Sequence, residues 1–316
     1  MRVLVVTNMY PTEQEPGFAP FVKEQVDAIR ERPEIEAIDV LVIDGRASKL
    51  NYFKAMPEVR RRVKSGSYDL IHAHYGLSGA AAMAQRKVPL VVTYHGSDVD
   101  NDVPSRRWQR WVSRVVARRA VNITVSKPIH DRLGRESVLI PCGISMEAFQ
   151  PRDREDARRE MEFPDGSTAL LFPSNTWRAE KEYPRFEKVV EVLRGRGVNV
   201  HPIVFEGFQR EQVPVLMAAA DVMVMTSSVE GTPVAVMEAL ACGLPVVSTD
   251  TGDVKAMLEP TDRSYVGDFD AEEFADQALR FAEPTVSRER HAGAELFDMD
   301  VIVDRIVDVY QRALAR

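Results

Sequence analysis

The chain has 316 residues, of which 45% are hydrophobic and 28% charged, and this composition excludes an extensively disordered protein. The length is comfortable for two domains. Its two cysteines, Cys142 and Cys242, cannot build a disulfide framework and lack metal-ligand spacing, which favours a cytoplasmic location. The opening segment is too short for a signal peptide, and no apolar run approaches the ~18 residues that span a bilayer.

The net charge of −7 conceals an asymmetry between the two halves. Residues 1–150 hold 22 Lys and Arg against 17 Asp and Glu, a net charge of +5, whereas the remainder holds 19 against 31, a net charge of −12. A basic half joined to an acidic half suggests two domains with different partners. The alternative, equally favoured here, is that both are ordinary solvated surfaces.

Short β-branched runs alternate with helical patterns in the first half of the chain. The predicted strands are RVLVVT, IDVLVI, YDLIHAH, PLVVTYH, VNITVS and SVLIP, and amphipathic segments lie at 20–32, 77–86 and 104–119. Continuous apolar strands separated by helices predict a parallel sheet covered on both faces.

The same pattern restarts after the polar stretch 150–167. The predicted strands are then TALLFP, VNVHPIVF, DVMVMT and LPVVST, and residues 299–316 form a closing amphipathic helix. We therefore expect an α/β fold of two doubly wound, Rossmann-like domains, residues 1–147 and 148–298, with the closing helix packed back on the first. Ligands of such sheets bind in loops at the carboxyl ends of the strands.

The stretch SSVEGTPVAVMEALACGLPVVSTDTG, residues 227–252, carries two unusual carboxylates. Glu230 follows a buried strand on what we interpret as an exposed turn, and Glu238 lies inside an apolar helix, where a charge is costly unless it is paired or binds a ligand. Both suit hydrogen bonds to sugar hydroxyls, Glu238 to a vicinal pair such as that of ribose. The alternative is that Glu230 caps the helix and Glu238 pairs with an arginine.

A helix start between the two glutamates offers a second feature. Pro233 suits the first helical position, where its missing N–H is harmless. The amides of Gly231, Thr232 and Val234 then predict a cradle for an anion or a hydroxyl group.

The stretch EGTPVAVMEALACGLPVVSTD closely resembles the donor-site signature of retaining glycosyltransferases of family 4, which have the GT-B fold. The resemblance implies that Glu230 contacts the donor sugar and Glu238 the nucleotide ribose. TYHGSDV is similar to the family's Thr-x-His-Gly-x-Asp, which places His95 near the donor's sugar and phosphate and Asp98 on the acceptor side. Without the resemblance, a single histidine after a strand is more often structural than catalytic, and Asp98 could equally cap the next helix. The resemblance extends over almost the whole chain, and it implies two domains that face each other across a cleft.

The segment FPSNTWRAEKEYP offers cations for a diphosphate. Lys181 aligns with a family lysine, but Asn175 stands where the family has an arginine, and we expect Arg178 to reach the same phosphates. In the first loop, Gly17 permits close backbone approach to the donor, where the family often has paired glycines. A G-x-G-x-x-G motif is lacking after the first strand, which argues against a nicotinamide or flavin dehydrogenase.

Two further histidines are interpreted as structural, and an acidic pair as acceptor-side residues that do not hold a metal. His72 and His74 alternate along a predicted strand without a third ligand at metal spacing. Asp98 and Asp100 form Asp-Val-Asp, but on the acceptor side of the family pattern. We expect no metal site and no cofactor beyond the nucleotide sugar, with the leaving diphosphate stabilised by Lys181, Arg178 and helix N-termini.

The segment PSRRWQRWVSRVVARRA predicts an amphipathic helix with an apolar stripe that includes Trp108 and Trp111. We expect the stripe to pack on the sheet. Its arginines leave peripheral association with an anionic membrane open.

These observations predict an enzyme that moves a hexosyl unit from a nucleotide-diphosphate sugar to a hydroxyl acceptor (a glycan, a lipid-linked sugar or a small molecule) with retention of configuration. We expect a role in cell envelope polysaccharide biosynthesis and no nucleic acid partner. Two alternatives stay open: a GT-B nucleotide-sugar epimerase, and a non-catalytic sugar-nucleotide-binding protein, which Asn175 and Ser145 in place of the usual Asp would suit.

Overall fold

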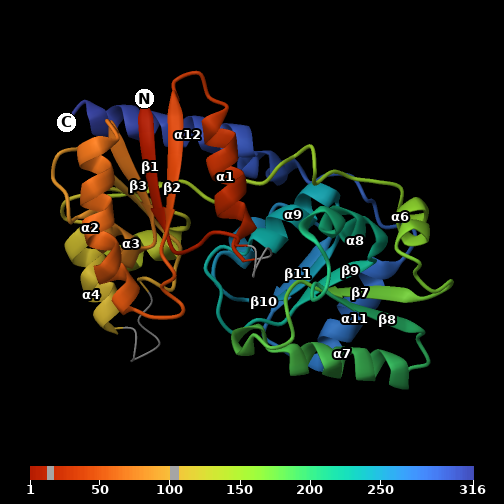
Figure 1. Ribbon diagram of the computed structural model, residues 1–316. Coiled ribbons are helices and arrows are strands. Elements are labelled where there is room, and N and C mark those ends of the chain that lie inside the picture. Colours follow the sequence, from red (N-terminus) through yellow and green to blue (C-terminus); the bar gives the residue numbers. More distant parts are fainter. Residues whose placement is uncertain (13–17, 100–106) are drawn as a thin grey trace. The chain divides into compact units, whose positions relative to one another are not determined.

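The computed structural model describes residues 1–12, 18–99 and 107–316, and the chain divides into two compact units (Figure 1). Unit 1 consists of Met1–Gly143 and Met299–Arg316, and unit 2 consists of Ile144–Asp298. The chain thus leaves unit 1 once and returns to it with its last helix.

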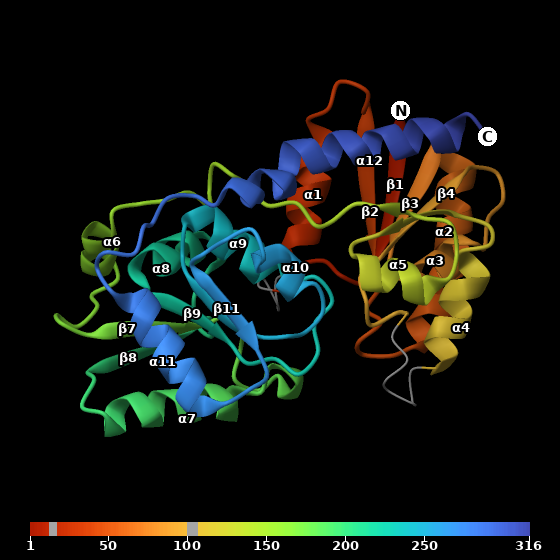
Figure 2. The same ribbon diagram turned by 180° about the vertical axis from the view of Figure 1, so that it is seen from behind.

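Unit 1 is built on a parallel sheet with the strand order β2-β1-β3-β4-β5-β6. Its strands are β1 (Arg2–Thr7), β2 (Ala37–Val42), β3 (Leu70–His74), β4 (Leu90–Tyr94), β5 (Val121–Thr124) and β6 (Val138–Leu139). Its helices are α1 (Pro20–Arg30), α2 (Leu50–Ser65), α3 (Gly76–Ala82), α4 (Arg107–Val116), α5 (Lys127–Leu133) and α12 (Met299–Leu314). The helices α1 and α12 cover one face of the sheet, and α2, α3 and α4 pack together on the other (Figure 2).

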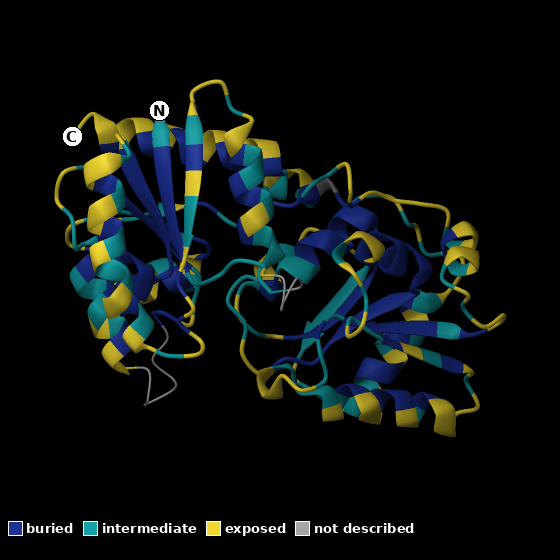
Figure 3. Cartoon of the chain, in the orientation of Figure 1, coloured by how far each residue is buried: buried dark blue, intermediate teal, exposed yellow. Residues whose placement is uncertain are grey.

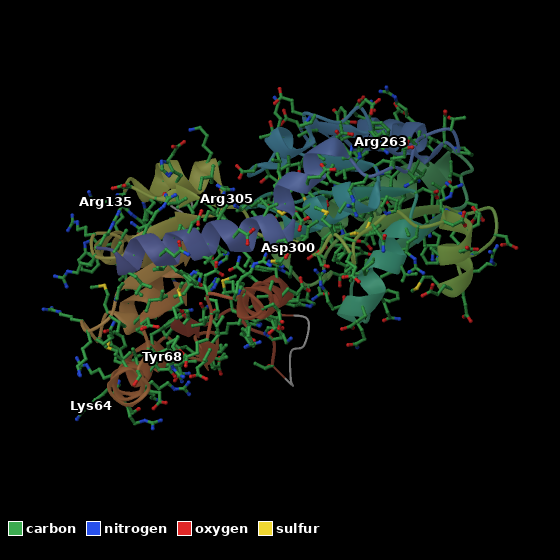
Figure 4. All side chains as sticks on the ribbon, turned by 90° about the horizontal axis from the view of Figure 1, so that it is seen from above. Lys64, Tyr68, Arg135, Arg263, Asp300 and Arg305 are labelled. Atoms are coloured by element: carbon green, nitrogen blue, oxygen red, sulfur yellow. The ribbon has the colours of Figure 1, made fainter. Side chains whose placement is uncertain are left out.

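Helix α12 belongs to the core of unit 1. Its inner face packs against alternate strand residues such as Val3 and Leu70. Asp300, labelled on α12 in Figure 4, pairs with Arg32 at 2.9 Å, and Arg305 donates to the Leu139 carbonyl at 2.6 Å. The buried residues of α12 are Met299, Ile302, Val303, Ile306, Val307, Val309, Tyr310 and Ala313. With that much apolar surface, the helix is an integral layer of this unit.

Unit 2 has a parallel sheet with the order β11-β10-β9-β7-β8. Its strands are β7 (Thr168–Phe172), β8 (Val200–Val204), β9 (Val222–Met225), β10 (Val246–Thr249) and β11 (Ser264–Gly267). Its α-helices are α6 (Arg154–Glu160), α7 (Tyr183–Gly195), α8 (Val213–Ala219), α9 (Val234–Cys242), α10 (Val254–Leu258) and α11 (Ala271–Ala282), joined by the short 3-10 helices η2 (Ala179–Lys181), η3 (Arg210–Gln212) and η4 (Ala292–Phe297). The central strands and the inner faces of α7 and α11 are buried (Figure 3).

The two sheets share one topology. Counted within each unit, the strand order is 2-1-3-4-5, with a sixth strand added in unit 1. The winding direction therefore reverses between the first and third strands, which are β1 and β3 in unit 1 and β7 and β9 in unit 2. This confirms the α/β, doubly wound fold expected from the sequence, although β11 was not predicted. Ligands of such sheets bind at the carboxyl ends of these two strands.

Candidate active site

The loops after β7, β9 and β10 form a single bonded structure at the carboxyl edge of the unit 2 sheet. The Ser228 amide donates to the Glu180 carbonyl at 3.0 Å, which ties the β9 loop to the β7 loop. The Glu230 amide donates to the Thr251 hydroxyl at 3.1 Å, which ties the β9 loop to the β10 loop. Because β7 and β9 flank the point where the winding reverses, this is where the topology predicts a ligand site.

Lys181 and Glu230 meet across that point. Lys181 Nζ lies 2.5 Å from Glu230 Oε1, and the Ser227 hydroxyl donates to the same oxygen at 2.6 Å. The two side chains are only 14% and 9% exposed. The expectation of an exposed turn at Glu230 is therefore wrong for its side chain, because the lysine and the serine cover it. Glu182, directly after Lys181, has φ 54°, a left-handed conformation that costs energy for a residue other than glycine and is typical of functional loops.

Gly252, in the loop after β10, packs closely against the backbone of the Glu230 turn. Its φ is +60°, and a Cβ atom there would lie 2.3 Å from the Gly231 carbonyl oxygen. The Asp253 amide donates to that same carbonyl at 3.2 Å. Sequence reasoning missed this support, although a glycine just after a strand is a signal for close backbone approach.

Helix α9 begins one residue later than expected. Pro233 is the N-cap, and Val234 is the first helical residue, so the placement of Pro233 inside the helix is wrong. The predicted cradle of Gly231, Thr232 and Val234 lies at this helix start. The Thr232 hydroxyl donates to the Asp253 carboxylate at 3.3 Å, which sets a negative charge at its edge.

Glu238 is 2% exposed in the second turn of α9, and it has an arginine partner. Arg210 Nη2, from η3, lies 2.6 Å from Glu238 Oε1. The guanidinium of Arg210 in turn stacks over the Phe149 ring, 4.7 Å from its centroid. The arginine pairing that the sequence left as an alternative is therefore present in the structure, and Arg210 is the residue that the sequence did not identify.

Arg178 lies apart from the Lys181–Glu230 pair. Its side chain is 43% exposed and pairs with Glu180 at 2.6 Å. The Arg178 amide also donates to the Asn175 carbonyl at 3.4 Å. Both predicted diphosphate cations thus have carboxylate partners, but Arg178 is the more exposed.

In unit 1, Asp98 is fully buried and bonded to the backbone. Its carboxylate accepts from the Gly76 amide at 3.0 Å, the His95 amide at 3.2 Å and the Gly96 amide at 3.0 Å. Burial raises the pKa of Asp98 to about 6, although these bonds favour the ionised form. Since Gly76 is the first residue of α3, the carboxylate holds the start of that helix and the turn after β4.

His95 follows β4 and is partly exposed. Its Nε2 atom lies 3.1 Å from His74 Nδ1, and the Phe21 ring packs 5.6 Å from its ring. Burial lowers the pKa of His95 to about 4, so the imidazole is neutral at pH 7. Gly17 and Asp100, two residues named from the sequence, lie outside the residues that the structure describes.

Helix α4 differs from its expected packing. Its buried residues are Gln109, Ser113 and Val116, whereas Trp108 is 47% and Trp111 67% exposed. The expectation that the whole apolar stripe packs on the sheet is therefore wrong for the two tryptophans, because the helix is rotated to bury its smaller side chains.

Neither a metal cluster nor a membrane helix is found in the described parts of the chain. Residues 1–12, 18–99 and 107–316 contain no group of three or more His, Cys, Asp or Glu able to hold a metal ion. Among the same residues, no helix is both long and apolar enough to cross a bilayer. Burial raises the pKa of both thiols, Cys142 and Cys242, to about 12, so they are poor nucleophiles.

Comparison with known proteins agrees with this geometry. Residues 1–148 match the family described as Glycosyltransferase Family 4, and residues 179–283 match Glycosyl transferases group 1. A teichuronic acid biosynthesis glycosyltransferase (TuaC) of Bacillus subtilis is 25% identical, with 89% of each chain covered. Among solved structures, sucrose-phosphate synthase from Thermosynechococcus elongatus superposes with a TM-score of 0.81 at 18% identity, with 99% of each chain covered. HepE of Anabaena, solved in complex with UDP and glucose, gives 0.72 at 16% identity over 99% of this chain and 100% of that chain. These likenesses confirm the GT-B fold.

Proposed function

The chain belongs to family 4 of the glycosyltransferases and so moves a sugar from a nucleotide-sugar donor to an acceptor, and we propose that Lys181 and Glu230 are the centre of its donor site. The observation that carries this proposal is their contact across the β7–β9 reversal point. In it, Lys181 binds the leaving diphosphate and Glu230 a hydroxyl of the transferred hexose. Lys181 then exchanges a carboxylate for a diphosphate of the same sign, so its charge keeps a counter-charge. Glu230 exchanges the lysine for a neutral hydroxyl donor and keeps its bond from the Ser227 hydroxyl.

The other donor contacts follow from the same arrangement. Glu238, steadied by Arg210, accepts from the ribose hydroxyls, and the α9 start binds phosphate or sugar through the Gly231, Thr232 and Val234 amides. Gly17 and Arg178 supply further contacts to the donor in this proposal. Transfer proceeds with retention of configuration, and the departing phosphate helps deprotonate the acceptor hydroxyl.

We propose that the reaction needs no divalent metal. Negative charge develops on the leaving diphosphate, and Lys181 with the helix start supplies the compensating charge. Asp98 is ill suited to hold a metal because its oxygens already accept three backbone amides.

The acceptor proposed here is a lipid-linked precursor of a cell envelope polysaccharide, used at the cytoplasmic face of the membrane. The relationship to the teichuronic acid enzyme supports the polysaccharide, and α4 supports the membrane. Trp108 and Trp111 are exposed beside the exposed Arg107, and amphipathic tryptophan with arginine suits an anionic lipid surface.

Sedimentation with vesicles tests the membrane contact. Wild type should bind phosphatidylglycerol vesicles more than phosphatidylcholine vesicles, less so at high salt, and the variant W108A/W111A should lose this binding while it keeps transfer to a water-soluble acceptor. Equal binding to both vesicle types, or none to either, would remove the membrane from the proposal.

Transfer itself is tested with labelled UDP-, GDP- and ADP-hexoses and purified protein. We expect turnover of one donor class and a loss of roughly one to two decades in kcat/KM for Glu230→Gln, since a hydrogen bond to a charged group is worth about 1.5–3 kcal/mol. Glu180→Gln is the matched control, because the Glu180 side chain is 44% exposed and pairs with Arg178 at 2.6 Å. Equal activity of both variants would remove Glu230 from the donor site.

A further inference from the structure

Three histidines lie together in unit 1: His72 in the middle of β3, His74 at its carboxyl end and His95 directly after β4. His72 and His74 alternate on β3, so they share a face, and their rings are 4.4 Å apart. His72 is bonded at both nitrogens, to the Tyr310 hydroxyl at 2.6 Å and to the Thr93 hydroxyl at 2.8 Å. His74 Nδ1 lies 3.1 Å from Nε2 of His95, and the two rings are stacked.

The second nitrogen of His74 distinguishes it from its neighbour. His74 Nε2 is buried and has no hydrogen-bond partner among the residues that the structure describes. The single proton between His74 and His95 can be shared in two ways. If His95 donates, His74 must carry its own proton on Nε2 as a buried, unpaired N–H. If His74 donates, Nε2 is left as an unpaired lone pair instead.

The first arrangement is the more costly, because unpaired buried N–H donors are rarer in proteins than undersatisfied acceptors. We infer that His74 is a positioning residue, which donates from Nδ1 to His95 Nε2 and so holds His95 in the tautomer that carries its proton on Nδ1. His95 then offers a substrate oxygen an N–H donor, and it has no free nitrogen with which to act as a general base.

The backbone around the pair is fixed in a way that supports this role. Tyr75, directly after His74, has φ 82°, a strained conformation for a residue other than glycine. The Asp98 carboxylate binds the amides of Gly76 and of His95, and so it fastens both sides of the contact. Burial lowers the pKa of His74 well below 6.5 and that of His95 to about 4, so both rings are neutral at pH 7 and the tautomer is the only variable.

The tautomers can be read directly from ¹⁵N shifts of histidine-labelled protein at pH 7. We expect His74 and His95 both to carry the proton on Nδ1. The His72→Phe variant, which alters an equally buried histidine of the same strand, should leave the His95 signal in place. An Nε2–H signal for His95 in the wild type would overturn the inference, whatever the activity of the enzyme.

Kinetics supply the second readout, and they rest on the placement of His95 near the donor's sugar and phosphate that the family resemblance implies. His74→Asn keeps an N–H near the position of Nδ1, whereas His74→Phe removes it. We expect H74F to lower kcat/KM by roughly tenfold, because it loses the hydrogen bond that orients His95. H74N should retain most of the wild-type kcat/KM. Equal losses in both variants would overturn the positioning role. Unchanged turnover in His95→Ala would refute a contact of His95 with the donor, but the wild-type ¹⁵N signals would still decide the tautomer.

Discussion

The two units place their polar residues at the same topological point but use opposite chemistry there. In unit 1 the groups at the carboxyl edge are neutral histidines bonded to hydroxyls and to one another, and a carboxylate bonded to backbone amides. In unit 2 they are ion pairs, Lys181 with Glu230 and Arg210 with Glu238. One strand order therefore supports either a fixed hydrogen-bonding surface or a set of exchangeable charges, depending on what the loops carry.

The difference has an energetic origin. Desolvation favours the neutral form of a histidine, so burying the unit 1 cluster at neutral pH separates no charges. A buried ion pair behaves otherwise, since removal of one partner leaves an uncompensated charge that costs about 3–5 kcal/mol. We therefore expect removal of an ion-pair partner in unit 2 to cost stability as well as transfer, and acid to cost stability in unit 1.

The largest effect is expected for Lys181→Ala. Loss of the cation that stabilises the leaving diphosphate should lower kcat/KM by roughly 10²–10³-fold. Transfer assays with excess EDTA, and with added Mg²⁺ or Mn²⁺, check the metal-free mechanism: wild-type activity should persist in EDTA, and no metal should rescue the variant. Abolition of wild-type activity by EDTA with recovery in Mn²⁺ would show that a metal neutralises the diphosphate.

Gly252→Ala tests the support beneath Glu230, with Gly166→Ala as a control of matched backbone. Both glycines have a positive φ, +60° and +64°, but an added Cβ meets nothing within 4 Å at Gly166. The control should cost about 1 kcal/mol of unfolding free energy from backbone strain alone. G252A should cost at least about 2 kcal/mol more, because the Gly231 carbonyl must move, and it should also reduce transfer. Equal unfolding free energies for the two variants would show that the β10 loop does not support the turn.

Acid should destabilise unit 1 through its histidines. Burial lowers the pKa of His72 to about 3 and that of His95 to about 4, and it lowers the pKa of His74 well below 6.5. As pH falls from 6.5 toward 4, the unfolded chain binds protons on these rings and the folded chain does not, so stability is lost at about 1.4 kcal/mol per pH unit for each proton. Asp98 opposes this with one proton, because its pKa is raised to about 6 and its folded form protonates first.

Hydrogen exchange of peptides from each unit at pH 7 and pH 5 measures this loss separately. In the wild type, the unfolding free energy of unit 1 should fall with decreasing pH, with a slope that corresponds to a net uptake of about two protons on unfolding. In the His72→Phe variant, this slope should correspond to about one proton fewer. His291 in unit 2, whose pKa burial lowers to about 4, contributes in the same direction, and it is why the two units must be followed separately. A pH dependence of unit 1 that H72F leaves unchanged would contradict the assignment.

Apolar patterns predicted most of the fold because they record burial directly. Strands such as β1 and β9 are continuous β-branched or apolar runs, whereas the edge strand β11, SYVG, is too short and polar to stand out. The glutamates were identifiable because Glu238 is anomalous in an apolar helix. Their partners were not, since Arg210 lies 28 positions before Glu238 and Lys181 lies 49 before Glu230. The exposure of Trp111 was missed because periodicity defines a stripe without saying which part of it faces the sheet.

The smallest effect is expected for Arg178→Ala. This variant tests whether any cation near the unit 2 site contributes to donor binding, or only one placed as Lys181 is. The Arg178 guanidinium is 43% exposed and already binds Glu180, so solvent and a neighbouring carboxylate both screen it. Its removal should lower kcat/KM only about two- to fivefold, in line with the roughly 0–1 kcal/mol of an exposed pair. Arg185→Ala is the control, since Arg185 is 34% exposed and 3.8 Å from Glu182, and it should have no effect on transfer. A loss for R178A as large as that for K181A would place the diphosphate at Arg178 and leave the Lys181–Glu230 contact with a structural role, as in the bonded cluster of unit 1.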